Sequence, residues 1–156
     1  MTKNSVWERS KQVKLKVAPE IRPGFDIGFD KRIPKDVADE MRVFVKWVEK
    51  NYSIPITLWV DFEYNHYLIS RKKKRVGFLF YWADFTTYPV FDHKNDIPEI
   101  HLPVRTEHST IEEILSSFIE AISLYFLWIC NELTEGSNVD EDEVEEILQS
   151  YLDSRK

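Results

Sequence analysis

The sequence lacks most of the features that would assign it to a specialised class. Its single cysteine, Cys130, cannot form an internal disulfide and lies in an apolar stretch, which predicts a buried, inert thiol. The four glycines do not cluster, which excludes a glycine-rich phosphate-binding loop. The apolar run 118–130 is shorter than a membrane span and carries Glu120, and the first sixteen residues are polar and lysine-rich rather than a secretory segment. We therefore expect a soluble cytoplasmic protein that makes no contact with membranes.

Catalytic and metal-binding motifs are also scarce. None of the four histidines has the spacing of a His-x-x-x-His zinc motif. A metal could in principle be held by a run that spans a turn and a strand without enforced geometry: His93, Asp96, Glu99 and His101. Asp61 and Glu63 share one face of a predicted strand, where they form either a carboxylate pair for glycoside hydrolysis or metal binding, or a solvated surface. We expect no cofactor, no metal and no catalytic residue.

Charge is distributed unevenly along the chain. Residues 1–50 carry 12 Lys and Arg against 8 Asp and Glu, whereas residues 109–156 carry 2 against 12. The basic N-terminal region could therefore lie against the acidic C-terminal region, within one chain or between two chains. The acidic third would repel phosphates, which argues against general nucleic-acid binding. We expect a protein partner or self-association.

The chain does contain one long, strongly apolar segment, from Ser109 to Leu133, which predicts a helix. Ser109 and Glu112 match the S-x-x-E capping box, in which each side chain accepts a hydrogen bond from a free backbone donor. Residues 118–130 are apolar almost all round, so this helix is expected at the centre of the core. The residues 135–137, which include a glycine, are expected to end it.

The N-terminal part predicts a short strand and a helix. Residues 11–17 alternate apolar and basic side chains, which indicates a strand with one solvated face. Residues 19–29 are rich in proline and glycine and predict an irregular surface segment. Pro34 suits the first position of a helix whose apolar stripe continues to about Asn51. The expected organisation is an N-terminal arm of residues 1–33 and one domain of residues 34–156.

The middle of the chain has the period-two alternation of strands. Predicted strands cover residues 56–64, 66–70 and 76–85, and a last strand covers residues 99–105. Pro98 and Pro103 lack ladder donors, so the last strand is expected at the edge of the sheet. An acidic helix from Asn138 or Asp140 closes the chain. The expected fold class is α+β, with a mixed, mostly antiparallel sheet of about four strands, two packed helices and a C-terminal acidic helix.

A basic hairpin is expected between the second and third strands, formed by Arg71, Lys72, Lys73, Lys74 and Arg75. Five cations at a hairpin tip are typical of a solvated turn, and they could also contact phosphate or an acidic partner. The aromatic run 78–82 beside them would suit base stacking, or a strand that is covered on both faces. Nucleic-acid association through this hairpin therefore stays open as an alternative.

The long helix is similar to the active-site helix of small bacterial zincin-like metallopeptidases. In that family the helix has roughly the pattern H-E-x-x-H-Y-x-x-W, and Tyr125, Phe126 and Trp128 stand at the matching spacing. The functional positions differ: Glu120 replaces the first His, Ala121 the Glu and Leu124 the second His. Zinc-dependent hydrolysis needs the two His imidazoles to bind the ion and the Glu carboxylate beside them. The resemblance therefore implies a zincin-like layout, over residues 34–133, without zinc and without hydrolytic activity.

One face of the same helix is semi-polar. At 100° per residue, one stripe collects Glu113, Ser117, Glu120, Leu124, Leu127 and Asn131. This stripe either packs under the C-terminal helix or forms the floor of a groove bounded by the edge strand with His101. The candidate groove residues are Ser117, Glu120, Leu124, Leu127 and His101.

Three functional hypotheses follow from these features. The first is a non-catalytic protein-binding or scaffold domain that uses the groove beside the 109–133 helix. The second is a hydrolase with a carboxylate and His site around Glu120 and His101. The third is a nucleic-acid-associated protein that uses the hairpin of residues 71–75.

Overall fold

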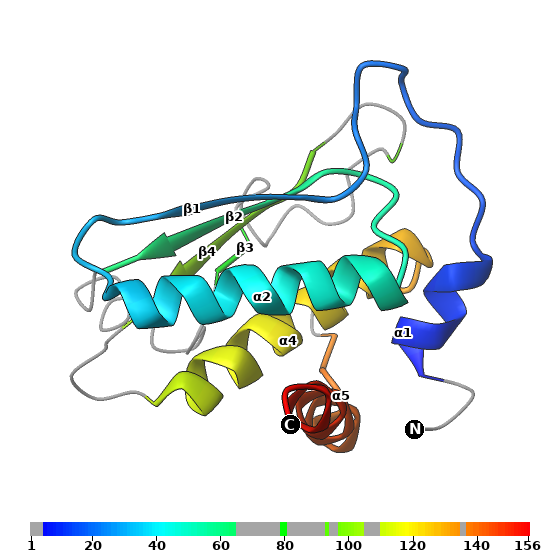
Figure 1. The fold of residues 1–156 in the computed structure, drawn as a ribbon. Helices are drawn as coiled ribbons and strands as arrows, with labels where there is room; N and C mark the ends of the chain where they lie inside the picture. Colours follow the sequence, from blue (N-terminus) through cyan, green and yellow to red (C-terminus); the bar gives the residue numbers. More distant parts are fainter. Residues whose placement is uncertain (1–4, 65–78, 81–92, 94–96, 105–109, 135–136) are drawn as a thin grey trace.

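The computed structural model describes residues 5–64, 79–80, 93, 97–104, 110–134 and 137–156. Its strands are β1 (Phe25–Phe29), β2 (Leu58–Glu63), β3 (Leu79–Phe80) and β4 (Glu99–Pro103). Its helices are α1 (Val6–Arg9), the 3-10 turn η1 (Ser10–Gln12), α2 (Lys35–Asn51), α4 (Ile111–Ile129) and α5 (Glu141–Ser154). Figure 1 shows the sheet on one side of the molecule and these helices on the other. In the described part of the chain, the domain is therefore a sheet with one helical layer.

The strands β1, β2 and β4 form a parallel sheet in that order, and the two-residue β3 pairs antiparallel with β4. The fold class is therefore α/β, and the expected α+β fold with a mostly antiparallel sheet and a zincin-like layout is wrong. The reason lies in the connection between β1 and β2. A strand that is followed by a long helix returns parallel to the first, because the helix carries the chain back across the sheet. Here α2 makes that crossover.

The strand β1 lies in the segment that was expected to be irregular. Pro19, Pro23 and Gly24 all precede the strand, so they do not interrupt its ladder. Gly24 has φ +97°, a left-handed conformation in which a side chain would be strained, and its carbonyl accepts a hydrogen bond from Leu58 N. Glycine and proline thus mark where the strand begins.

The strand expected over residues 11–17 is also wrong. Residues 11–12 belong to η1, and residues 13–17 have no regular structure. Val13, Leu15 and Val17 nevertheless pack against the core while the intervening lysines are exposed. The alternation correctly indicates which side chains turn toward the core, but within the described part of the chain no strand pairs with this segment.

The strand β4 lies inside the sheet rather than at the edge, contrary to the expectation from its prolines. It pairs with β2 along its full length and with β3 through Ile100 and His101. Pro98 lies just before the strand and accepts a hydrogen bond from Trp59 N, and Pro103 is its last residue. Both missing donors therefore fall at the ends of the ladder, where they cost little.

The central position of α4 is confirmed. Most of its side chains are buried, among them Phe118, Ile122 and Phe126 with no exposed surface. Its capping box is displaced by one residue from the expected pair: Thr110 Oγ1 accepts from Glu113 N at 3.1 Å, and Glu113 Oε1 accepts from Thr110 N at 2.8 Å. Ser109 lies outside the described residues.

The helix α4 also ends earlier than expected. Asn131 adopts φ 60°, its N–H bonds to Trp128 O, and Glu132 N bonds to Leu127 O at 2.7 Å. This is a Schellman motif in which asparagine takes the left-handed position that glycine usually occupies. The nearest glycine, Gly136, lies outside the described residues.

The N-terminal arm shares the core of the domain. The Trp7 side chain is fully buried, packs edge-on against Tyr52 and Phe126, and donates a hydrogen bond from Nε1 to Ser123 Oγ at 2.8 Å. The strand β1 belongs to the sheet. The described part of the arm, residues 5–33, thus contributes to the same hydrophobic cluster as α2 and α4.

The predicted helices α2 and α5 are confirmed, and α5 begins at the N-cap Asp140. Tyr151 of α5 packs its ring on Phe44 of α2 and donates a hydrogen bond to Glu40, which also pairs with Arg155. Burial alone would raise the pKa of Glu40, but these two partners together lower it.

Arg9 pairs with Glu132 at 2.6 Å, so one contact between the basic and acidic regions exists within the chain.

The strand expected over residues 56–64 is confirmed as β2. The strand expected over residues 66–70 and the hairpin 71–75 lie outside the described residues, and β3 is the described piece of the strand expected over residues 76–85. Among the described helices, none combines the length and the apolarity that crossing a bilayer requires.

Candidate functional site on the open face of the sheet

The two faces of the sheet differ sharply in burial and polarity. Along β2, Leu58, Val60 and Phe62 are buried, whereas Trp59 and Asp61 are exposed. Phe62 packs edge-on against Phe118 of α4, with ring centroids 5.2 Å apart, so the buried face is the one that the helices cover. Because successive strand residues point to opposite faces, Trp59 and Asp61 lie on the other side. We call this second side the open face.

The open face carries the most exposed large apolar residues of the described chain. Trp59 is 48% exposed and Ile97 is 42% exposed. Together they line a hollow that also includes Ile21, Pro23 and Thr57. Trp59 borders a second hollow of about 220 Å³, which runs across β1, β2 and β4 toward His101. Trp59 therefore lies between two neighbouring hollows of the open face.

Carboxylates surround this tryptophan. Among the described residues that line the two hollows, the acidic ones are Glu20, Asp26, Asp61 and Glu99, and the basic ones are Arg22 and His101. Register explains their gathering: Asp26 on β1 is the partner of Trp59, and Glu99 on β4 is its partner on the other side. The open face is therefore apolar at its centre and acidic at its rim.

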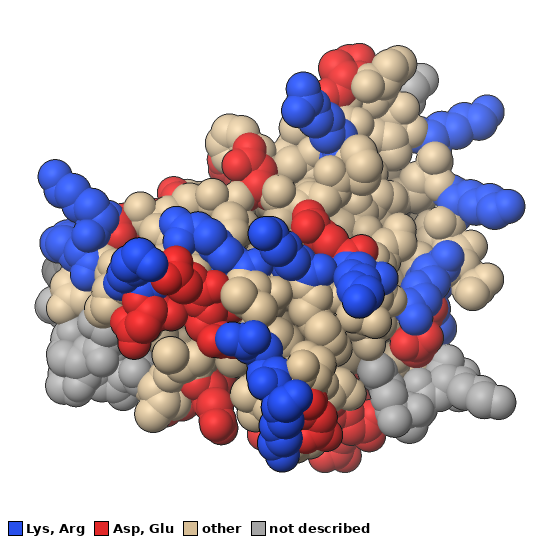
Figure 2. Space-filling model, viewed as in Figure 1, with Lys and Arg blue, Asp and Glu red and all other residues tan. Residues whose placement is uncertain are grey.

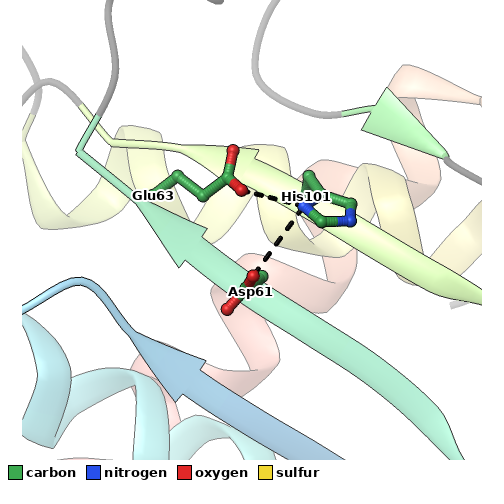
Figure 3. Close-up of side chains that lie close together, drawn as sticks. All are labelled: Asp61, Glu63 and His101. Atoms are coloured by element: carbon green, nitrogen blue, oxygen red, sulfur yellow. Dashed lines mark hydrogen bonds and ion pairs between the residues drawn. The ribbon is translucent and has the colours of Figure 1, made fainter.

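Three side chains on this face form a tight cluster. Asp61 and Glu63 are two residues apart on β2, and His101 on β4 is the register partner of Asp61. His101 Nδ1 lies 2.9 Å from Glu63 Oε2 and 3.9 Å from Asp61 Oδ2 (Figure 3). One ligand atom from each of the three lies within 4.8 Å of the others. We call this group the DEH cluster.

The cluster is partly shielded from solvent and favours a charged imidazole. The side chain of His101 is 22% exposed and that of Asp61 58% exposed. The hydrogen bond with Glu63 raises the pKa of His101 above its ordinary value; burial opposes this, and the charges of Glu63, Asp61 and Glu99 add to it. The arrangement can hold a proton or another cation between two carboxylates.

The structure separates His101 from the four predicted groove residues of α4. Ser117, Glu120 and Leu127 of α4 are half-buried and Leu124 is buried, with α5 packed against the same helix. Burial and the nearby charge of Glu141 raise the pKa of Glu120. His101 alternates with the buried Ile100 and Leu102, so it faces away from α4. A site that joins Glu120 to His101 would have to reach through the sheet.

Other residues singled out in the sequence have structural partners. His93 Nε2 donates to the carbonyl oxygen of Trp128 at 2.7 Å, and its ring packs on that indole. The Tyr125 hydroxyl donates to Ile56 O at 2.5 Å and accepts from Ile56 N at 3.0 Å. Cys130 is half-buried rather than buried, and burial raises the pKa of its thiol.

The sequence singles out each member of the DEH cluster but does not predict that they meet. It predicts Asp61 and Glu63 as a pair on one strand face, and His101 on a separate edge strand. Their meeting depends on β2 and β4 being neighbours in register, which periodicity within each strand does not contain. Trp59 is not among the candidate site residues expected from the sequence. The one available signal was that a large aromatic alternates with carboxylates on the polar face.

Comparison with protein-family models, curated proteins and solved structures finds no match to this chain. The resemblance of α4 to the zincin-like helix therefore stays a prediction. What the described residues define is an α/β domain whose parallel sheet has a helical layer on one side and an acidic, tryptophan-centred open face on the other.

Proposed function

We propose that this protein is a non-catalytic binding domain that recognises a segment of another protein on the open face of its sheet. The partner segment carries lysine or arginine next to apolar side chains. The observation that carries the proposal is the exposure of Trp59, at 48%, between two hollows with an acidic rim. This keeps the binding function expected from the sequence and moves the surface from the α4 stripe to the sheet.

Trp59 supplies the apolar part of recognition. Tryptophan offers a large, rigid contact area with little side-chain entropy to lose, and it is among the residues that dominate binding energy at interfaces. Ile97 extends the apolar surface along the same hollow. A leucine or aromatic side chain of a partner would be desolvated between them.

The surrounding carboxylates determine which partner is preferred. Glu20, Asp26 and Glu99 border the apolar centre. Complementary charge at a rim accelerates encounter and selects against partners of the same sign more than it adds affinity. A basic segment is therefore favoured, and acidic segments and nucleic-acid phosphates are repelled.

The open face is also preorganised. Its side chains stand on β1, β2 and β4, which share ladders of full length, and the opposite side of each strand is packed into the core. A rigid surface loses little conformational entropy on binding. An affinity in the micromolar range, about −8 kcal/mol, is a reasonable expectation for a short segment.

Selection of displayed random peptides on the purified protein tests the proposal. Enriched peptides should combine lysine or arginine with an apolar residue, and their affinity should fall with rising salt because the rim charges are screened. Trp59→Ala should weaken the best peptide by at least about tenfold, as expected for an interface hot spot.

Val43→Ala is the matched control, because Val43 is an exposed apolar residue, 37% exposed, on α2 rather than on the sheet. It should leave peptide affinity unchanged. The proposal fails if no peptide is enriched, or if the selected peptides bind the Trp59→Ala protein as well as the unaltered one.

A further inference from the structure

The DEH cluster has a property that peptide recognition does not require. Its three side chains, two carboxylates and one imidazole, each place a possible metal ligand atom close to the other two. Asp61 and Glu63 project from the same face of β2 because they are two residues apart. His101 stands beside Asp61 in the ladder with β4. All three are thus held by the two strands at the middle of the sheet, β2 and β4.

The spacing of the ligand atoms is close to that of a metal centre. Bonds of about 2.0–2.1 Å in tetrahedral geometry place neighbouring ligand atoms about 3.3–3.4 Å apart. The two distances from His101 Nδ1, 2.9 Å to Glu63 and 3.9 Å to Asp61, lie on either side of that value. All three ligand atoms lie within 4.8 Å of one another, so the two carboxylates and the imidazole would draw together slightly to share one ion.

The surroundings favour a cation and leave it accessible. Asp26 and Glu99 line the hollow next to the cluster and add negative potential. Asp61 is more than half exposed, so an ion there would keep an open coordination position. Gly28 is the register partner of Asp61 on β1, and a Cβ at that position would lie 3.4 Å from Asp61 Oδ1. The glycine therefore leaves the carboxylate room to turn.

The ligand set indicates which ions would fit. One imidazole with two carboxylates suits first-row divalent ions, whereas calcium and magnesium prefer oxygen ligands alone. Zinc sites with three protein ligands keep one coordination position open to solvent, whereas structural zinc sites are closed by four protein ligands.

We propose that Asp61, Glu63 and His101 form a binding site for a divalent first-row transition metal ion such as Zn²⁺ or Mn²⁺. The site lies on the sheet face opposite α4, so it is separate from the α4 positions that align with the zincin-like zinc motif. It is independent of the peptide-binding proposal, because Trp59 is not a ligand.

The test is calorimetric titration of the full chain, free of any affinity tag and stripped with a chelator, with Zn²⁺, Mn²⁺, Ca²⁺ and Mg²⁺. A single equivalent of Zn²⁺ or Mn²⁺ should bind, and Ca²⁺ and Mg²⁺ should bind at least tenfold more weakly. His101→Ala and Asp61→Asn should each weaken transition-metal binding by at least about tenfold.

Glu20→Gln is the matched control: it removes a carboxylate of the same face outside the cluster and should leave metal affinity within about twofold. Asp61→Asn is the second variant in case His101→Ala misfolds, because the exposed Asp61 side chain contributes little to the core. Absence of stoichiometric binding, or equal binding by the unaltered and His101→Ala proteins, would overturn the site and leave an ordinary hydrogen-bonded ion pair. Peptide affinity is measured separately, in the presence of a chelator, and does not depend on the outcome of the metal titration. Each proposal can therefore fail without the other.

Discussion

The two faces of the sheet are built from the same strands and have opposite chemistry. On the helical side, Leu58, Val60 and Phe62 of β2 have almost no exposed surface and pack beneath α4. On the open face, the residues between them are Trp59 and Asp61, both exposed. Parallel sheets are usually covered on both faces and have continuous apolar strands. The clean alternation in β2 belongs to a strand with one solvated face.

The two faces of the sheet therefore have different roles: the helical side stabilises the fold, and the open face is available for binding. Residues on the helical side are fixed by packing, and changes there should be measured as lost stability. Residues on the open face contribute little packing, so their types are free to serve binding. Charge shows a related division on the helical side: Figure 2 shows a row of Lys and Arg side chains along the outer surface of α2 and acidic side chains below it, toward α5.

The largest effect is expected from a comparison of two tryptophans. Trp7→Ala removes a fully buried indole that packs on Tyr52 and Phe126 and hydrogen-bonds Ser123. It should lower the free energy of unfolding by about 3–5 kcal/mol. Trp59→Ala should lower it by less than about 1 kcal/mol, since half of that side chain is already in water.

Urea unfolding followed by circular dichroism measures both values. If Trp59→Ala destabilises the protein as much as Trp7→Ala does, the open face is part of the core and the contrast between the two faces is wrong.

A smaller effect is expected at the contact between α4 and the segment before β2. Tyr125→Phe removes a hydroxyl that satisfies both the N–H and the carbonyl of Ile56. Leaving these buried backbone groups without a partner should cost about 1–3 kcal/mol. Tyr52→Phe is the control, because among the described residues none hydrogen-bonds to its hydroxyl although its ring packs on Trp7. Equal losses for the two variants in urea unfolding would show that the Ile56 contact contributes nothing specific.

The smallest effect concerns the half-buried Glu120. Burial and the charge of Glu141 raise its folded pKa, so the folded state favours the protonated carboxyl. The stability that this provides is fully present below the unfolded pKa and is lost as pH rises through the folded pKa. At pH 7 the ionised side chain is therefore a small cost, and Glu120→Gln should be more stable than the unaltered protein by up to about 1 kcal/mol.

The advantage of Glu120→Gln should shrink as pH falls toward 4, because the unaltered carboxyl then takes up its proton. Glu145→Gln, which makes the same change at an exposed position of α5, is the control. Unfolding curves at pH 4, 5.5 and 7 decide the matter; a difference for Glu120→Gln that grows on acidification contradicts the assigned environment.

The helices and β2 could be predicted from the sequence because their signals are local. Pro34 marks the start of α2, Asp140 that of α5, and the apolar run of residues 118–130 correctly indicates the buried α4. The capping box was displaced by one residue because the overlapping sequence STIEE contains two S/T-x-x-E matches, and the structure uses Thr110.

The sheet order could not be predicted, because strand pairing is a long-range property. Pro23 and Gly24 concealed β1 by suggesting a loop, and Pro98 and Pro103 suggested an edge although both lie at the ends of β4. The error carried over to the site. With β4 at an edge, His101 had no reason to meet Asp61, and the α4 stripe remained the most distinctive polar surface in the sequence.

The most direct test of the account is a map of where the selected basic peptide binds, from backbone amide chemical shifts of the protein titrated with that peptide. We expect the largest shifts on the open face, at Asp26, Trp59 and Glu99, with little change along α4. Shifts centred on Glu120 and Leu127 instead would place the binding surface on the helical side and contradict the separation of the two faces.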